Sequence, residues 1–252
     1  MSVLLSQRAG SPAPFGPAWT PLDLGADLIA WWSADRADLI THSGGAVSSW
    51  KDIVAGYDAV QATGAAKPTY GATGWNGAAP GITGDGVDDA LLLAPVPGAF
   101  PTGSTGGEAW ALADQAAAAS DGVTRTIAAW GNASAGSRHL RRSVVSGVNC
   151  AEAIAGDGSV SAAATNLSVD FTGRHVVRVV TTPTSVRADV NGIAGSSVST
   201  VPATLTNRFR LFANSTSGGG GYFQGTIRDV LLTSPLSGGN ADLLLGYLIG
   251  RR

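Results

Sequence analysis

Short apolar runs, many of them rich in β-branched residues, constrain the fold of this chain more than any other feature. Clusters of glycine, proline, asparagine and serine separate the runs, and this pattern is typical of the strands of a sandwich or barrel. In one run, alternation places Trp110 and Leu112 on the same face of a strand. Asn191-Gly192 supplies the two positive-φ positions of a type I′ hairpin turn. The runs expected as strands are 28–32, 89–94, 108–113, 124–130, 142–148, 175–182, 185–190, 208–213 and 226–233.

Composition narrows the class to a folded, non-fibrous protein. Hydrophobic residues make up 44% of the 252 positions and charged residues 13%, whereas disordered chains are poor in aliphatic residues and rich in charge. The 35 glycines follow no three-residue period, which excludes collagen. Lysine and glutamate are too scarce for a coiled coil. The length is ample for a hydrophobic core and suits one large β-sandwich.

The two ends of the chain depart from the strand pattern. Residues 1–25 are rich in proline and glycine, and we expect an extended arm that is either a disordered tail or a strap on a neighbouring subunit. Residues 26–252 form the expected sandwich domain, which closes with a helix over 238–252 capped by Asn240. The alanine-rich stretch 114–120 is expected as a loop or single turn. The arm residues expected to make assembly contacts are Pro12, Pro14, Phe15, Pro17 and Trp19.

The first third of the chain carries turn and strand motifs in a fixed order. They are Ala34-Asp35, Ser43-Gly44-Gly45, Trp50-Lys51-Asp52, 59–63, Pro68-Thr69-Tyr70, Asn76-Gly77 and 86–89. The series resembles the concanavalin A-like, laminin-G-like jelly-roll domains of bacterial secreted proteins and of structural proteins in phages and phage-like particles (gene transfer agents). The resemblance implies an all-β antiparallel sandwich. Apart from it, the size and apolar character of Trp50 and of either Trp31 or Trp32 predict that they pack between the sheets. One sandwich hosts many functions, so function needs separate arguments.

Charge and cysteine content restrict the partners and the place of folding. A net charge of −2 gives no attraction to nucleic acid, and no apolar run is long enough to span a membrane. The N-terminus lacks the basic region of a signal peptide. The single Cys150 excludes an intrachain disulfide and is expected as a small buried residue. We therefore expect a protein made in the bacterial cytoplasm and carried on the surface of a virion or phage-like particle.

The residues needed for sugar chemistry are mostly missing. Sandwich glycosidases use two glutamates on one strand, whereas Glu108 and Glu152 fall on different segments. Jelly-roll lyases pair a tyrosine or histidine with arginine, but the basic cluster 138–142 does not follow their order. The three histidines lack metal-ligand spacing, and His175 is expected to be structural. No catalytic residue is assigned.

Two kinds of binding site are candidates. Asp85, Asp88 and Asp89 could hold calcium, because related sandwiches bind this ion on their rim through carboxylates and carbonyls. Asx turns account for the same three residues without an ion. Glycan binding needs an exposed aromatic platform with polar neighbours. The candidates for it are Trp75, Trp110, Asn214 and Tyr222.

Together these features predict a non-enzymatic structural or adhesion protein of a phage or phage-like particle, such as a decoration, spike, fibre or tail-associated protein. Its arm would contact other particle proteins, its loops would face host surface polysaccharide, and it would form a homo-oligomer. No cofactor other than the candidate calcium is expected. The alternatives are a polysaccharide lyase or glycoside hydrolase on the same fold, and a free carbohydrate-binding module.

Overall fold

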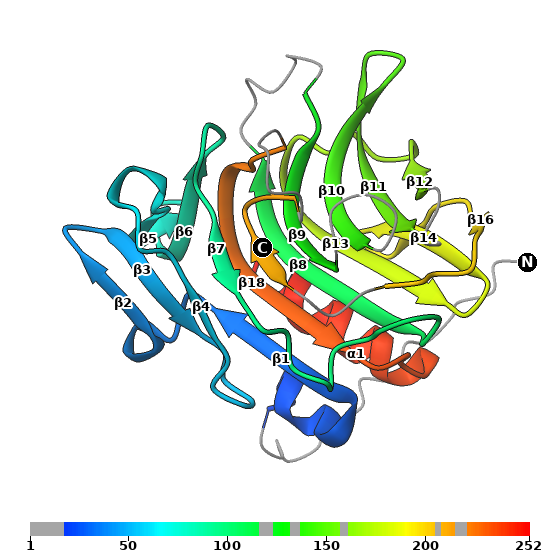
Figure 1. Cartoon of the computed structure of the whole chain (residues 1–252), viewed down its shortest axis with the longest axis horizontal. Helices are drawn as coiled ribbons and strands as arrows, with labels where there is room; N and C mark the ends of the chain where they lie inside the picture. The colour runs from blue at the N-terminus through cyan, green and yellow to red at the C-terminus, as the bar shows by residue number, and fades with distance from the viewer. Residues whose placement is uncertain (1–17, 116–122, 132–136, 157–160, 205–207, 215–220) are drawn as a thin grey trace, which may run out of the picture.

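The two β-sheets of the protein lie face to face in a computed structural model that describes residues 18–115, 123–131, 137–156, 161–204, 208–214 and 221–252 (Figure 1). All pairings between the named strands of these residues are antiparallel, and only the isolated bridge between Thr126 and Tyr222 is parallel among them. This confirms the predicted all-β antiparallel sandwich. The expected hairpin turn is also present, since Asn191 and Gly192 have φ values of 50° and 83°. Residues 18–27 lie on the domain surface and include a 3₁₀ segment, η1 (Pro21–Asp27). Two further 3₁₀ turns are η2 (Ala37–Leu39) and η3 (Gly64–Ala66).

One sheet carries the C-terminal helix on its outer face, and we call it the helix-bearing sheet. Its strands run in the order β5 (Thr69–Trp75), β6 (Ala79–Asp85), β18 (Gln224–Thr233), β8 (Gly107–Gln115), β13 (Gly173–Thr182) and β14 (Ser185–Val190). Two strands share the same edge of β18. β6 pairs with the first half of β18, and β1 (Leu28–Ser33) pairs with the second half. Two short strands, β15 (Ile193–Ala194) and β16 (Val198–Ser199), pair with the free edge of β14.

The opposite sheet contains the remaining nine strands in the described part of the chain. Their order is β2 (Ile40–Ser43), β3 (Ala46–Lys51), β4 (Asp58–Val60), β7 (Leu91–Leu93), β17 (Phe209–Leu211), β9 (Arg125–Gly131), β10 (Ser137–Val145), β11 (Val148–Gly156) and β12 (Ser161–Asn166). The pairing of Ala46 with Thr69 links the two sheets. The run 142–148, expected as one strand, instead spans the end of β10, a turn at Ser146-Gly147 with positive φ, and the start of β11.

The main core lies between the sheets and is built by strand alternation. In β8, Ala109, Ala111 and Ala113 face the opposite sheet. Trp110 and Leu112 share one face, as predicted, and the structure shows that it is the outer face. Trp32 and Trp50 are fully buried in this core, and the Trp32 ring stacks on Phe209 with centroids 4.9 Å apart. Trp31, the residue before Trp32 in β1, points instead to the outer face.

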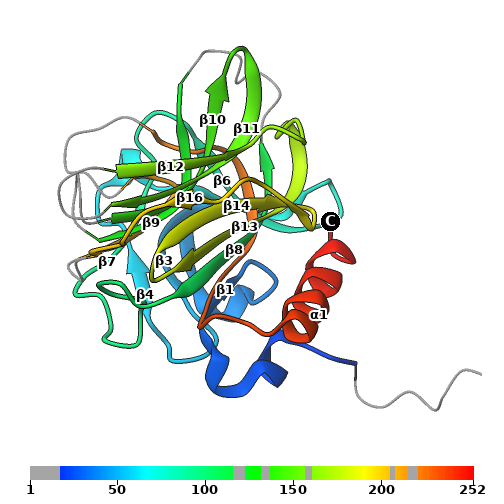
Figure 2. The same cartoon turned by 90° about the vertical axis from the view of Figure 1, so that its right-hand side faces the viewer.

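Helix α1 (Gly238–Ile249) covers part of that outer face, as Figure 2 shows. Its buried residues Ala241, Leu244 and Leu248 belong to a second apolar cluster that includes Trp31 and Trp110. The helix was expected, but the expected cap was wrong, because the Ser237 side chain accepts the hydrogen bond and Asn240 contributes only its backbone N–H. Among the described residues, no helix combines the length and hydropathy of a membrane span.

Candidate functional site

A row of four polar side chains crosses the outer face of the helix-bearing sheet. Thr83 on β6 pairs with Thr226 on β18, Thr226 pairs with Asp114 on β8, and Asp114 pairs with Arg174 on β13. Residues directly opposite one another on neighbouring strands project to the same face. We call Thr83, Thr226, Asp114 and Arg174 the polar row.

Hydrogen bonding and charge connect members of the row. The hydroxyl oxygens of Thr83 and Thr226 are 2.8 Å apart, and an Arg174 nitrogen lies 3.7 Å from an Asp114 carboxylate oxygen. Burial raises the pKa of Asp114, while the charge of Arg174 opposes that rise. The side chains of Asp114 and Arg174 remain 34% and 41% exposed, so both can reach a ligand.

Two hollows meet at Asp114. The larger, about 820 Å³, extends to Thr172, Arg174, His175 and Arg252 beside the end of α1. The smaller, about 370 Å³, extends over Thr83, Gln224 and Thr226 to Asp85. Hydroxyl, amide, carboxylate and guanidinium groups line the combined surface, which can therefore both donate and accept hydrogen bonds.

His175 borders the larger hollow but has its ring nitrogens engaged. Nε2 lies 2.9 Å from the Thr172 carbonyl oxygen, and Nδ1 lies 2.9 Å from the side-chain nitrogen of Asn191. Donation from Nε2 and acceptance at Nδ1 satisfy both contacts with a neutral ring, and burial lowers the pKa of His175. His175 is therefore a structural residue, as expected.

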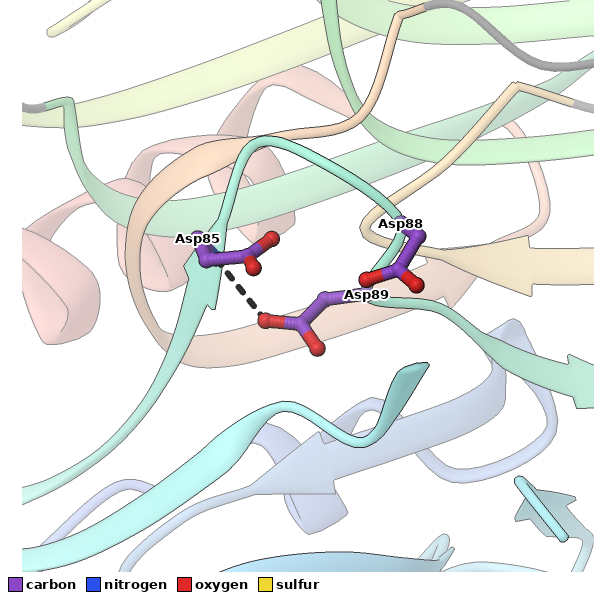
Figure 3. Close-up of side chains that lie close together, drawn as sticks. All are labelled: Asp85, Asp88 and Asp89. Atoms are coloured by element: carbon purple, nitrogen blue, oxygen red, sulfur yellow. Dashed lines mark hydrogen bonds between the residues drawn. The ribbon is translucent and has the colours of Figure 1, made fainter. Parts of the chain in front are cut away.

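Three aspartates form an acidic cluster beside the smaller hollow. Asp85 ends β6, and Asp88 and Asp89 follow in the next turn, with carboxylate oxygens from all three within 4.8 Å of one another (Figure 3). Asp89 is 5% exposed and accepts a 2.8 Å hydrogen bond from the backbone N–H of Asp85. Burial raises the pKa of Asp89 to about 6, and the charges of Asp85 and Asp88 contribute to the rise.

The acidic cluster supplies part of what calcium requires. Calcium takes six to eight oxygen ligands, and the three carboxylates provide fewer. The Asp85 carboxylate also accepts the Val87 N–H at 2.7 Å, which is the Asx-turn geometry expected without an ion. The Gly86 carbonyl already accepts a 2.7 Å hydrogen bond from Arg125. A bound calcium ion would therefore complete its shell with solvent or ligand oxygens.

The two tryptophans predicted as glycan platforms are buried, and that part of the prediction is wrong. Trp75 is 0% and Trp110 2% exposed. The indole N–H of Trp75 donates to the Arg251 carbonyl, that of Trp110 donates to Glu108, and the Arg178 guanidinium lies 4.5 Å from the centroid of the Trp110 ring. Both belong to the apolar cluster beneath α1, so neither ring offers a face to a ligand.

Asn214 and Tyr222 lie close to each other, away from the two tryptophans. A Cβ on Gly221, the residue before Tyr222, would lie 3.4 Å from the Asn214 side chain. Both residues are half-buried, and Tyr222 forms a bridge to Thr126 on β9. Their assignment to glycan binding stays a prediction. Of the predicted arm residues, Pro12, Pro14, Phe15 and Pro17 lie outside the described residues.

The groups that a sugar-cleaving enzyme would use are held in structural contacts. Glu108 pairs with Arg178 at 2.6 Å, and Glu152 pairs with Arg141 at 2.5 Å. Burial raises the pKa of Cys150 to about 11, which agrees with its expected role as a small buried residue.

Strand alternation divides the basic cluster at 138–142. Arg138 is fully buried in the interior and donates to Thr204, Thr181 and two backbone carbonyls. Arg141, on the other face of β10, is 23% exposed and pairs with Glu152. The cluster therefore presents no continuous cationic surface.

The polar row escaped the sequence analysis because its members lie far apart in the chain. Thr83 and Thr226 are 143 positions apart, and strand register alone aligns them with Asp114 and Arg174. The available signal was that Asp114 follows Trp110 and Leu112 at two-residue spacing, which predicts the same outward face.

No protein-family model matches the sequence, and a search among curated proteins finds no relative. Solved structures do share the fold. Trypanosoma rangeli sialidase in complex with sialic acid superposes over 92% of this chain with a TM-score of 0.53 and 15% identity. The binding domain of botulinum neurotoxin serotype D covers 90%, with a TM-score of 0.59 and 12% identity. An arabinofuranosidase complexed with arabinofuranosyl-xylobiose covers 81%, with a TM-score of 0.56 and 11% identity.

These similarities establish the sandwich fold. The matches span 35% of the sialidase chain, 51% of the toxin domain chain and 50% of the arabinofuranosidase chain. The chain is therefore much shorter than the proteins whose fold it shares.

Proposed function

We propose that this chain is a non-catalytic glycan-binding protein that a phage or phage-like particle displays toward its host, and that the polar row holds the glycan. The observation that carries the proposal is the row itself. Four neighbouring strands place two hydroxyls, a carboxylate and a guanidinium in one line beside the 820 Å³ hollow. Sugar hydroxyls donate and accept hydrogen bonds, so a surface of mixed donors and acceptors on rigid strands suits them.

Two further points support a binding role. Solved neighbours of this fold include a sialidase, an arabinofuranosidase and a toxin binding domain, two of them solved with sugar ligands. Both glutamates of the chain are engaged by arginines, which disfavours the usual pair of catalytic carboxylates. The resemblance of residues 28–93 and the proline-rich arm support the proposed attachment to a particle.

The test is binding to an array of bacterial surface polysaccharides, followed by calorimetry with the glycan that binds. Asp114→Ala should weaken binding at least about tenfold, because a hydrogen bond to a charged group contributes roughly 1.5–3 kcal/mol. Thr226→Val should weaken it by a smaller factor. Asp242→Ala, an exposed change on α1 outside the row, is the matched control. Unchanged affinity in Asp114→Ala would show that the glycan binds outside the polar row.

The acidic cluster favours one alternative function, glycoside hydrolysis. With a pKa of about 6, Asp89 can hold a proton near pH 6 while Asp85 and Asp88 lie beside it, so the cluster offers a carboxylic acid next to carboxylates, the two kinds of group that glycosidases use. Release of reducing ends from the bound polysaccharide at pH 5–6, lost in Asp89→Asn, would support the hydrolase. Binding without release supports the adhesion role.

A further inference from the structure

The larger hollow beside the polar row is lined by more positive than negative charge. Arg174 on β13 and Arg252, beyond the end of α1, both border it, and Asp114 is the one acidic residue of its described lining. His175 adds no charge, because the contacts of its two ring nitrogens suit the neutral ring. The lining therefore holds two guanidinium groups against one carboxylate.

Most of the Arg174 guanidinium is available to a ligand. Its Nε lies 3.7 Å from the Asp114 carboxylate, which is longer than the roughly 2.7–2.9 Å of a charge-assisted hydrogen bond. The side-chain oxygen of Asn76 accepts a 3.1 Å hydrogen bond from Nη1. Within the described part of the chain the other N–H groups have no acceptor, and the side chain is exposed.

Arg252 has no acidic partner among the described side chains. Their ion pairs include none with its guanidinium, and its charge reaches His175, whose pKa is lowered by burial and further by Arg252. The charges of Asp170 and Asp114 act on His175 in the opposite direction. Asp170 lies outside the lining, where its carboxylate accepts the Thr172 hydroxyl at 2.7 Å. Arg252 thus adds a positive charge to the hollow that no ion pair in the described residues neutralises.

The apolar part of the lining suits a sugar ring. Ile249, the last residue of α1, is 41% exposed and borders the hollow three positions before Arg252. Contact with the C–H groups of a pyranose ring would remove this apolar surface from water. A free inorganic anion gives no such contact, so an acidic sugar fits the hollow better than an isolated ion.

We propose that the glycan on the polar row contains a carboxylated sugar residue, and that Arg174 and Arg252 bind its carboxylate in the larger hollow. The inference rests on the proposed function of the row. A planar carboxylate matches the fork of a guanidinium group. The lining favours one negative charge over the nearly two of a phosphate monoester, because Asp114 faces the same space. Thr226 and Thr83 then meet uncharged hydroxyls further along the row.

Matched polysaccharides test the charge of the ligand. Alginate, hyaluronan and polygalacturonate join the array of bacterial surface polysaccharides, and each acidic member is placed beside its carboxyl-reduced form, in which the uronic acid is a neutral sugar. We expect the chain to bind at least one carboxylated polysaccharide. Its reduced form should bind at least about tenfold more weakly, because a charge-assisted hydrogen bond is roughly twice as strong as a neutral one.

Charge-removing variants connect the carboxylate to the hollow. Arg174→Gln and Arg252→Gln should each weaken binding of the native polysaccharide at least about fivefold. Both should leave binding of the reduced form nearly unchanged, because the contact that they remove is already absent there. Arg36→Gln removes the same charge from an exposed arginine paired with Asp38 and is the matched control. Equal losses for both forms, or no loss for either, would overturn the assignment of the carboxylate to these arginines.

Failure of this inference and failure of the proposed function give different results. Equal binding of the native and reduced forms, still weakened by Asp114→Ala, would overturn the carboxylate and leave the polar row as a site for neutral glycans. Absence of binding to every member of the array would overturn both.

Discussion

Asp89 is a buried carboxylate whose protonation should govern how stability varies with pH. Its pKa rises from an ordinary 3.8 to about 6 in the fold, so the folded state binds the proton more tightly than the unfolded state. The stabilisation that the proton provides is complete below pH 3.8 and is lost as the pH rises through 6. At pH 7, where Asp89 is ionised, this shift lowers the free energy of unfolding by roughly 3 kcal/mol relative to its value below pH 3.8.

Asp89→Asn should therefore stabilise the metal-free protein at pH 7–8 by up to roughly 3 kcal/mol and leave it nearly unchanged at pH 4. The amide oxygen of asparagine can still accept the Asp85 N–H. Urea unfolding in EDTA from pH 4 to pH 8 measures the effect, with the exposed Asp242→Asn as control. A variant less stable than the parent at pH 8 would contradict the argument. Repeating the series in calcium chloride tests the ion, because bound calcium would favour ionised Asp89 and reverse the order.

For single residues, the sequence predicted features that depend on local backbone chemistry and missed features that depend on contacts between distant segments. Asn191-Gly192 was predicted as a turn because its backbone angles are a local property. Trp75 looked accessible because glycine and asparagine surround it, yet its indole donates to Arg251, 176 positions away. No local pattern announces a contact at that distance.

At the scale of elements, ion pairs as well as apolar packing hold the end of the chain against the helix-bearing sheet. Arg251 lies 3.0 Å from Asp229, which is fully buried on β18, and 2.8 Å from Asp35. The sequence analysis placed the helix but not this attachment, because Asp229 sits inside an apolar strand whose partner on that face could not be known.

Arg251→Ala should destabilise the protein by about 3 kcal/mol, because it leaves the buried Asp229 carboxylate without its cationic partner. The comparison is urea unfolding of Arg251→Ala, Asp229→Asn and the double variant, whose combined cost should be well below the sum of the single costs. Arg36→Ala, which removes an exposed ion pair with Asp38, should shift the midpoint little. Additive costs would show that Arg251 and Asp229 do not act together.

The cap of α1 gives a smaller prediction for the same element. Ser237→Ala should cost about 0.5–1 kcal/mol, because the hydroxyl accepts the N–H of Asn240 at the first turn. Asn240→Ala should cost less, since it keeps the backbone N–H that the cap uses. Thermal unfolding of the two variants separates them, and a larger loss in Asn240→Ala would restore the asparagine as the cap.

For the molecule as a whole, fold class was predictable and the site was not. Period-two alternation and turn residues are written into each segment, so the sandwich could be inferred without knowing which strands are neighbours. The polar row exists only after β6, β18, β8 and β13 are aligned in register. Binding surfaces assembled across a sheet are therefore less visible in the sequence than the sheet itself.

Assembly is also a property of the whole chain. We expect the full protein to self-associate and the chain lacking residues 1–14 to be monomeric, because the proline-rich arm is the segment predicted to make assembly contacts. Sedimentation velocity of both proteins measures the difference. Identical sedimentation coefficients per chain would remove the arm from assembly.

The antiparallel pairing of β1 with β18 bears on how the protein would respond to tension. The arm enters β1 at Leu28, which pairs with Thr233 at the far end of β18, whereas Thr226 of the polar row lies near the start of β18. A particle pulling on the arm and a polysaccharide pulling on the row would draw the two strands past each other along their length. The five paired positions of β1 would then share the load at once rather than open one by one. Tension applied between the arm and the polar row would therefore load β1 and β18 in shear.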